Sequence, residues 1–386
     1  MNQKIRGSYL FYLSAHHSSF FKKEREPHRK VGGKMNNTVP WIILTNNTVA
    51  KGGIYGVVST CTLISVALTL FLIYRHLKHW YDPDEQKCIV RILLMVPIYS
   101  VSSLLAIIAG DYALYFTLVR DCYEAYVLYQ FFTLLVHYVK KEAPDHFNTI
   151  YIGSDEDGGT GLGGEEVGQL LARFGERSFA FPLCMMTYQS GNRMYLHIKR
   201  CSLQYVFVKP LFSAIAILLQ LAGVYHPGSY DVGHAYFWIA VILNISAGLA
   251  LYFIFLFYDL IKKVIFMHRP LHKLIAIKIL VFFIFWQAVA LGVLYYFHAL
   301  PAFFGWSEYR SSETVQNILV CLEMTGLAVF NFYAFSYTVY RVDDGGHTLD
   351  VALDSLASVI NQSDIIVDTT DAFHPDRLKH AIDKRQ

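Results

Sequence analysis

The sequence predicts an all-α integral membrane protein with seven transmembrane helices, an N-terminus outside and a C-terminus in the cytosol. Its 386 residues are 54% hydrophobic and 16% charged, whereas soluble domains are typically about 45–50% apolar and about 25% charged. It also contains seven apolar runs of about 20 residues or more, the length that a helix needs to cross a bilayer core. Basic and non-basic connections alternate between these runs.

The seven runs define a transmembrane domain over residues 54–340. Gly110 alone separates the second run from the third, so a tight turn is expected there. Pro97 lies inside the second run, and it predicts a kink because proline removes a backbone donor. The runs are 54–74, 88–109, 111–138, 206–225, 235–258, 274–299 and 315–340.

The distribution of lysine and arginine predicts the orientation. The first, third and fifth connections are basic, whereas the second and fourth have no lysine or arginine and the sixth has only Arg310. Because basic loops stay in the cytosol, the N-terminus is expected outside. A long cytosolic loop is then expected at about 139–202, and a cytosolic acidic tail at 341–386.

Residues 1–53 are expected to form an extracellular or luminal tail. Residues 1–34 carry eight lysines and arginines, which are unfavourable to export without a signal peptide, so this stretch is interpreted as an upstream extension. Asn36 and Asn46 each begin an Asn-x-Thr sequence. In a luminal tail both asparagines are candidate glycosylation sites, which predicts a glycoprotein.

The segment WYDPDEQK, residues 80–87, predicts the start of the second helix. Asp82 is suited to the N-cap position, Pro83 to the first helical position and Glu85 to the third, where it would complete a capping box. Helix caps of this kind need no further role. A structural interpretation is therefore favoured over a functional one.

The cytosolic segments offer fewer signals. Apolar residues from Val167 to Phe174 recur at helical spacing and predict a short amphipathic helix in the long loop. Cys184 and Cys201 are candidate palmitoylation sites near the membrane, with unmodified structural cysteines as the favoured alternative. In the tail, residues 349–360 could form a short helix, but composition favours disordered polar chain.

The sequence gives no reason to expect a metal, another cofactor or a nucleic-acid partner. The six cysteines show no metal-ligand spacing. His226, Asp231 and His234 share one short outer loop, where a solvated turn is favoured over a metal site. The net charge of +3 is mild.

Polar side chains recur near the middle of four predicted helices. Such groups are costly in hydrocarbon and usually face a bundle interior or a water-filled cavity. At about 1.5 Å per residue, Arg120 and Glu323 lie at a similar depth of roughly 14 Å, so Glu323 is the expected partner of Arg120 across the bundle. Either a solute path or a structural ion-pair network would satisfy these groups. The set is Arg120, Asp121, Glu124, Asn244, Gln287 and Glu323.

Arg91, Lys209 and Lys278 lie nearer the cytosolic ends of their helices. Long basic side chains at such positions usually extend toward the interface, and this is the default expectation for all three. Contact of Lys209 with an anionic substrate or a lipid headgroup is the alternative.

Four strings resemble the organic solute transporter alpha-subunit family, specifically its transmembrane protein 184 branch. They are WYDPDEQKCIVRILLMVPIYS, RDCYEAYVLYQF, KRCSLQYVFVKPL and PLHKLIAIKILVFFIFWQ, and the similarity covers roughly residues 54–345. The resemblance implies a seven-span fold. It also implies transport of steroid conjugates and bile acids with a single-span partner, or a role in trafficking and signalling as in other branches.

The chain departs from the family pattern at two places. Lys140-Lys141-Glu142 replaces the usual Gly-Gly-Glu, and the cysteine run of the solute-transporter branch is reduced to Cys184. The fold is therefore expected to transfer better than the substrate.

The function expected is that of a membrane transporter, or transport-associated protein, for amphipathic organic solutes of steroid or bile-acid type. Movement would be facilitated by the polar mid-membrane site, without enzymatic activity. The expected partners are the lipid bilayer, the solute and a single-span subunit or a second copy of the chain. Plasma membrane or endomembrane is the expected location. The alternatives are a trafficking or signalling scaffold and a seven-span receptor.

Overall fold

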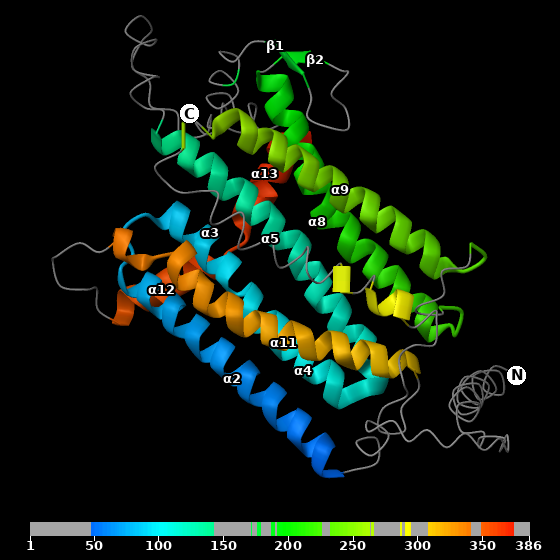
Figure 1. The fold of residues 1–386 in the computed structure, drawn as a ribbon. Coiled ribbons are helices and arrows are strands. Elements are labelled where there is room, and N and C mark those ends of the chain that lie inside the picture. Colours follow the sequence, from blue (N-terminus) through cyan, green and yellow to red (C-terminus); the bar gives the residue numbers. More distant parts are fainter. Residues whose placement is uncertain are drawn as a thin grey trace, which may run out of the picture. The chain divides into compact units, whose positions relative to one another are not determined.

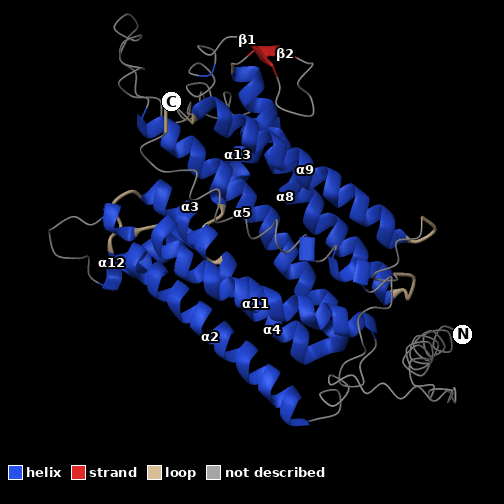
Figure 2. Ribbon diagram, viewed as in Figure 1, coloured by secondary structure: helices blue, strands red, loops and turns tan. Residues whose placement is uncertain are grey.

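In the computed structural model, the described residues are almost all helical (Figure 2). The chain divides into two compact units, 1–44 and 45–386, and every described residue belongs to the second. The described residues are 48–142, 171, 176–178, 187–189, 191–225, 232–262, 264–265, 286–287, 290–294, 308–340 and 349–373.

Five helical stretches in the described part of the chain are long and apolar enough to cross a membrane. They agree with five of the seven predicted runs. A further helix, α5 (Ala113–Glu142), has 30 residues but carries charged side chains in its first half. The predicted run 274–299 lies mostly outside the described residues, so the count of seven and the orientation stay predictions. The five stretches are α2 (Thr48–Lys78), α3 (Pro83–Leu93) continued by α4 (Met95–Ala109), α8 (Asn192–Leu221), α9 (Ala235–Ile261) and α11 (Glu308–Ala334) continued by η4 (Tyr337–Tyr340).

A one-residue interruption of the helix lies near the position where Pro97 predicts a kink. A turn at Leu94 separates α3 from α4. Pro97 has no N–H for the carbonyl of Leu93, and its ring would clash with that carbonyl in a regular helix. The interruption therefore falls one turn before the proline.

Gly110 begins the short 3₁₀ turn η2 (Gly110–Tyr112) that joins α4 to α5. Its φ of 42° lies in the left-handed region, which costs other residues roughly 1–2 kcal/mol. An added Cβ would also collide with the guanidinium of Arg310. The turn thus requires glycine for its backbone and for its close approach to a side chain.

Gly110→Ala is expected to lower the free energy of unfolding by about 1–2 kcal/mol from backbone strain, and further because Arg310 must move. Gly223→Ala is the matched control, because Gly223 has a φ of 70° and nothing within 4 Å of an added Cβ. Thermal unfolding of both variants in detergent would measure the difference. Equal losses would show that displacing Arg310 costs nothing.

Helix α5 lies at the centre of the described bundle. It packs against α4, α8 and α9, while α11 packs against α2 and α4 (Figure 1). The second half of α5 is buried among aromatic rings, with the Phe132 ring centroid 5.3 Å from that of Phe257 in α9 and 6.3 Å from that of Tyr195 in α8. The position of α5 places its charged first half between α4, α8 and α11.

The long connection contains two short strands that the sequence did not predict. The strands β1 (Glu176–Ser178) and β2 (Thr187–Gln189) pair antiparallel, with Arg177 opposite Tyr188. The all-α fold class is confirmed by the helices, and this hairpin is a short addition to it. The paired residues are nine or more apart in the sequence, so no local hydrophobic pattern predicts the pairing. Of the amphipathic helix expected at 167–174, only Leu171 is described, and it is helical and buried.

The tail forms two helices, α12 (Leu349–Ile360) and α13 (Ser363–Phe373). The prediction of disordered chain is therefore wrong for residues 349–373. Helix α12 packs against α2 and α3, and α13 packs against α8. These tertiary contacts bury apolar side chains of the two helices and so stabilise them, which the acidic composition alone does not predict.

Candidate functional site

The charged first half of α5 is held by ion pairs. Asp121 lies between two cations: its carboxylate is 3.2 Å from Lys209 Nζ in α8 and 3.6 Å from Arg120 Nε in its own helix. The side chains of Arg120 and Lys209 are 7% and 11% exposed, whereas that of Asp121 is 27% exposed. The carboxylate is therefore the most accessible member of this trio.

Arg120 connects α5 to two further helices. Its Nη1 donates to Ser103 Oγ in α4 and to Asn317 Oδ1 in α11, each over 3.4 Å. The guanidinium also lies 5.6 Å from the ring centroid of Tyr99, within cation–π range. One buried side chain thus ties α4, α5 and α11 together.

Glu124 lies one turn beyond Arg120 on α5. Its carboxylate accepts a hydrogen bond of 3.5 Å from Tyr99 in α4. Arg120, Asp121, Glu124 and Lys209, termed the charged cluster below, contain two cations and two carboxylates. The cluster is formally neutral when all four are ionised.

Lys209 differs from its default expectation. It is buried and pairs with Asp121 instead of extending to the interface. Helix α8 packs against α5, and this brings the Asp121 carboxylate within 3.2 Å of the ammonium group. The sequence showed both charges but not that their helices are neighbours.

Glu323 is not the partner of Arg120. Gln287 donates to the Glu323 carboxylate, and Arg120 takes Asn317 from α11 instead. The prediction compared depths only. Depth does not specify which side of α11 faces α5. In the structure Asn317 faces Arg120, and Glu323 forms a separate pair with Gln287.

Asn244 is not part of either group. Its side chain is exposed and donates over 2.8 Å to the carbonyl of Ala240 in its own helix. A polar side chain on a membrane helix can find its hydrogen-bond partner on the backbone of the same helix. The depth of Asn244 in the membrane therefore does not show that it belongs to a shared site.

Arg91 is also buried, at 2% exposure, and does not extend to the interface. Its guanidinium donates to the carbonyl of Val359 over 3.0 Å, to Gln130 Oε1 over 3.3 Å and to the carbonyl of Asn361. Two of these acceptors belong to the tail. Lys278, the third residue of this prediction, lies outside the described residues.

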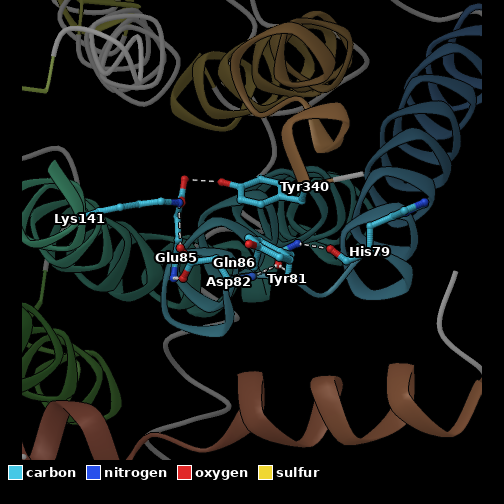
Figure 3. Close-up of polar contacts among 7 residues, drawn as sticks. All are labelled: His79, Tyr81, Asp82, Glu85, Gln86, Lys141 and Tyr340. Carbon is cyan, nitrogen blue, oxygen red and sulfur yellow. Dashed lines mark hydrogen bonds and ion pairs between the residues drawn. The ribbon is translucent and has the colours of Figure 1, made fainter. Parts of the chain in front are cut away.

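The start of α3 differs from the predicted capping box in one contact. Asp82 accepts from the N–H of Glu85 over 3.3 Å, and Pro83 occupies the first helical position. The N–H of Asp82, however, donates to Gln86 Oε1 and not to Glu85. Glu85 is turned toward Lys141 and Tyr340 instead (Figure 3).

The ion pairs at this helix start involve Lys141 at the end of α5. Its Nζ lies 3.0 Å from Asp82 and 3.3 Å from Glu85. Burial acts to lower the pKa of Lys141, but the hydrogen bonds and charges of the two acids outweigh it, so the pKa lies above its usual value. The start of α3 is thereby fastened to the end of α5.

Gln86 is the residue at this site that sequence reasoning missed. It is fully buried, accepts from the N–H groups of Tyr81 and Asp82, and donates to the carbonyls of His76 and His79. Its amide therefore closes the turn between α2 and α3 (Figure 3). A glutamine at the fourth helical position is a weak signal, because nothing local requires it.

Gln86→Leu is expected to lower the free energy of unfolding by about 2–3 kcal/mol, because several buried backbone groups lose their partner. Gln86→Glu keeps the two acceptor contacts and loses both donations. It is the matched variant, because it separates the effect of the two hydrogen bonds that the amide accepts from the effect of the two that it donates. Chemical unfolding in detergent would measure both, and a neutral Gln86→Leu would contradict this role.

The other predicted sites are placed as follows. Cys201 is a free, half-buried cysteine in α8, while Asn36, Asn46 and Cys184 lie outside the described residues. Within the part of the chain that the structure describes, no group of three or more His, Cys, Asp or Glu side chains is arranged to hold a metal ion.

Apolar helices able to span a membrane, with a buried charged cluster between them, define a multi-pass integral membrane protein. The chain belongs to the organic solute transporter Ostalpha family, whose model matches residues 54–340. This confirms the family resemblance carried by the four strings.

A relative in Dictyostelium discoideum, a transmembrane protein 184 homolog, is 34% identical over 287 residues. The match covers 73% of this chain and 52% of the relative, so the chain spans about half the length of that protein. No solved structure matches.

Proposed function

We propose that the chain is a membrane transporter, or a transport-associated protein, for amphipathic organic solutes, which pass beside the charged cluster. The observation that carries this proposal is the Asp121–Lys209 pair, which joins α5 to α8 over 3.2 Å. An anionic solute head group can replace Asp121 as the partner of Lys209. Exchange of partners would let the solute enter and leave without exposing an unpaired charge to hydrocarbon.

The surroundings of the pair suit a solute that is apolar over most of its surface. Tyr99 and Tyr205 lie beside the cluster at 1% and 2% exposure, so their rings would bind a flat apolar body only after α4 or α8 moves and uncovers them. A steroid or bile-acid conjugate combines such a body with an anionic head. Membership of the Ostalpha family supports an organic solute, and the steroid or bile-acid class is the finer part of the proposal.

The remaining parts of the proposal follow from the sequence. They are seven spans with the N-terminus outside, a location in the plasma membrane or endomembrane, and no enzymatic activity. Association with a single-span subunit or a second copy of the chain completes the proposal. Trafficking or signalling through the cytosolic segments is the outcome to expect if no solute moves.

Arg120→Gln is expected to lower solute flux by about tenfold or more, because a buried cation of the cluster is lost. Glutamine can still donate to Ser103 and Asn317, so the variant should reach its membrane. Uptake of a panel of steroid and bile-acid conjugates into vesicles would be measured with and without co-purifying partners. Lys262→Gln is the control, because Lys262 is half-exposed at the end of α9.

Unchanged flux in Arg120→Gln would remove the cluster from the path. If wild-type protein moves no conjugate in either preparation, the transport proposal fails and the scaffold alternative stands.

A further inference from the structure

The tail helices α12 and α13, residues 349–373 and termed the strap below, are fixed to three helices of the bundle by polar contacts. Arg91 in α3 donates to two strap carbonyls. Tyr126 in α5 donates over 2.9 Å to Gln362, at the junction of the two strap helices. Val359 and Ala372 of the strap are buried against the bundle, at 2% and 0% exposure.

The attachment of α13 is equally specific. The Asp368 carboxylate accepts from Tyr129 of α5 over 2.6 Å and lies 2.9 Å from Lys199 of α8. Arg200 donates over 2.7 Å to the carbonyl of Ala372. The strap is therefore a docked element with a defined inner face.

The opposite face of the strap carries large apolar side chains that the described protein leaves uncovered. On α13, Ile365, Asp368 and Ala372 face inward, whereas Ile366 and Val367 lie on the other side of the helix. The exposed large apolar residues of the two strap helices are together termed the outer stripe. Its members and their exposures are Leu356 38%, Ile360 67%, Ile366 69%, Val367 54% and Phe373 46%.

The strap lies near one end of the membrane-spanning helices. Arg91 is about 12 Å along the helix from Pro83, and Lys199 is about 9 Å from Arg193, where the candidate spans begin. These spans contain 27 and 29 residues, about 40 Å of helix, and so extend about 5 Å beyond each side of a hydrocarbon core of about 30 Å. The contacts that hold the strap are therefore close to the edge of the hydrocarbon.

The strap packs against a helix whose own exposed apolar side chains are expected to face lipid. Helix α12 packs against α2, and α2 exposes Leu70, Phe71 and Tyr74 near this same end. An uncovered apolar stripe beside such a surface marks a membrane contact. Interfacial helices bury an apolar face about 5–10 Å into the boundary between headgroups and acyl chains, which agrees with the position that the helix lengths imply for the contacts of the strap.

We infer that the strap is a membrane-interface element, whose outer stripe lies among the acyl chains of the adjacent leaflet. The segment 349–373 contains five aspartates and no lysine or arginine. Anionic headgroups are therefore disfavoured, and the partner is a zwitterionic phospholipid surface. This inference does not depend on solute transport.

The test uses full-length protein in phosphatidylcholine vesicles, with the dye bimane attached to Ile366→Cys and the signal of the labelled parent subtracted. Lipid carrying a quencher near its headgroup should remove about half or more of the fluorescence, and aqueous iodide little of it. Leu70→Cys, exposed on α2 near the end where the strap packs, is the lipid-facing control, and Lys262→Cys is the water-facing control. Val367→Cys is the second variant if Ile366→Cys does not fold.

Quenching by iodide but not by lipid would place the stripe in water and overturn the inference. Protection from both quenchers would show that protein, either a second copy or another chain, covers it, and would overturn the inference as well. Replacing part of the phosphatidylcholine by phosphatidylserine should not increase the lipid quenching. An increase would contradict the zwitterionic partner.

Discussion

Lys209→Met is expected to lower the free energy of unfolding by about 3–5 kcal/mol, because it leaves Asp121 partly buried without its nearest cation. Replacing both partners, as Asp121→Asn with Lys209→Met, should recover most of this loss, since no uncompensated charge then remains. Denaturant unfolding in detergent would measure the variants. A single variant that costs less than about 1 kcal/mol would show that the pair does not hold α5 to α8.

Lys87→Met is the matched control for this experiment. Lys87 lies 3.6 Å from Asp84, whose side chain is 69% exposed, and exposed pairs contribute about 0–1 kcal/mol. The double variant also separates the two roles of the cluster. If it folds but loses flux, the pair lines the path. If it folds and keeps flux, the pair only joins the helices.

Arg91→Met is expected to lower the free energy of unfolding by about 3 kcal/mol or more and to release the strap. The variant leaves the carbonyls of Val359 and Asn361 and the amide of Gln130 without their buried donor, and each such loss costs roughly 1–3 kcal/mol at most sites. Hydrogen exchange of residues 349–373, together with thermal unfolding, would measure both effects.

Arg200→Met is the comparison variant, because Arg200 holds the strap through the single carbonyl of Ala372. Its effect on exchange should be smaller and centred on α13. Unchanged exchange across the strap in Arg91→Met would show that the other contacts hold it without the guanidinium.

The helices were the most predictable part of the fold. The runs 54–74 and 235–258 fall within α2 and α9, which the structure extends by a few residues. Hydrophobic length is a property of the chain itself, because a helix satisfies its own backbone within one segment. The interruption near Pro97 and the N-cap at Asp82 are local for the same reason.

The candidate site was predictable only in part. Charges within an apolar run stand out in the sequence, so Arg120, Asp121 and Glu124 were found. Their partners were not, because depth along a helix leaves its rotation and its neighbours undetermined. Lys209 and Asn317 joined the site, while Glu323 and Asn244 did not, as a result of how α8, α9 and α11 pack.

The sequence by itself determined the family, the membrane class and five of the predicted spans, since these depend on strings of residues and on hydrophobic length. Tertiary structure alone decided the pairing of Lys209 with Asp121, the role of Gln86 and the docking of the strap. The strap shows the physical reason most clearly. Arg91 and Arg200 hold it through backbone carbonyls, and a carbonyl is present at every residue, so no residue type marks where such a contact will form.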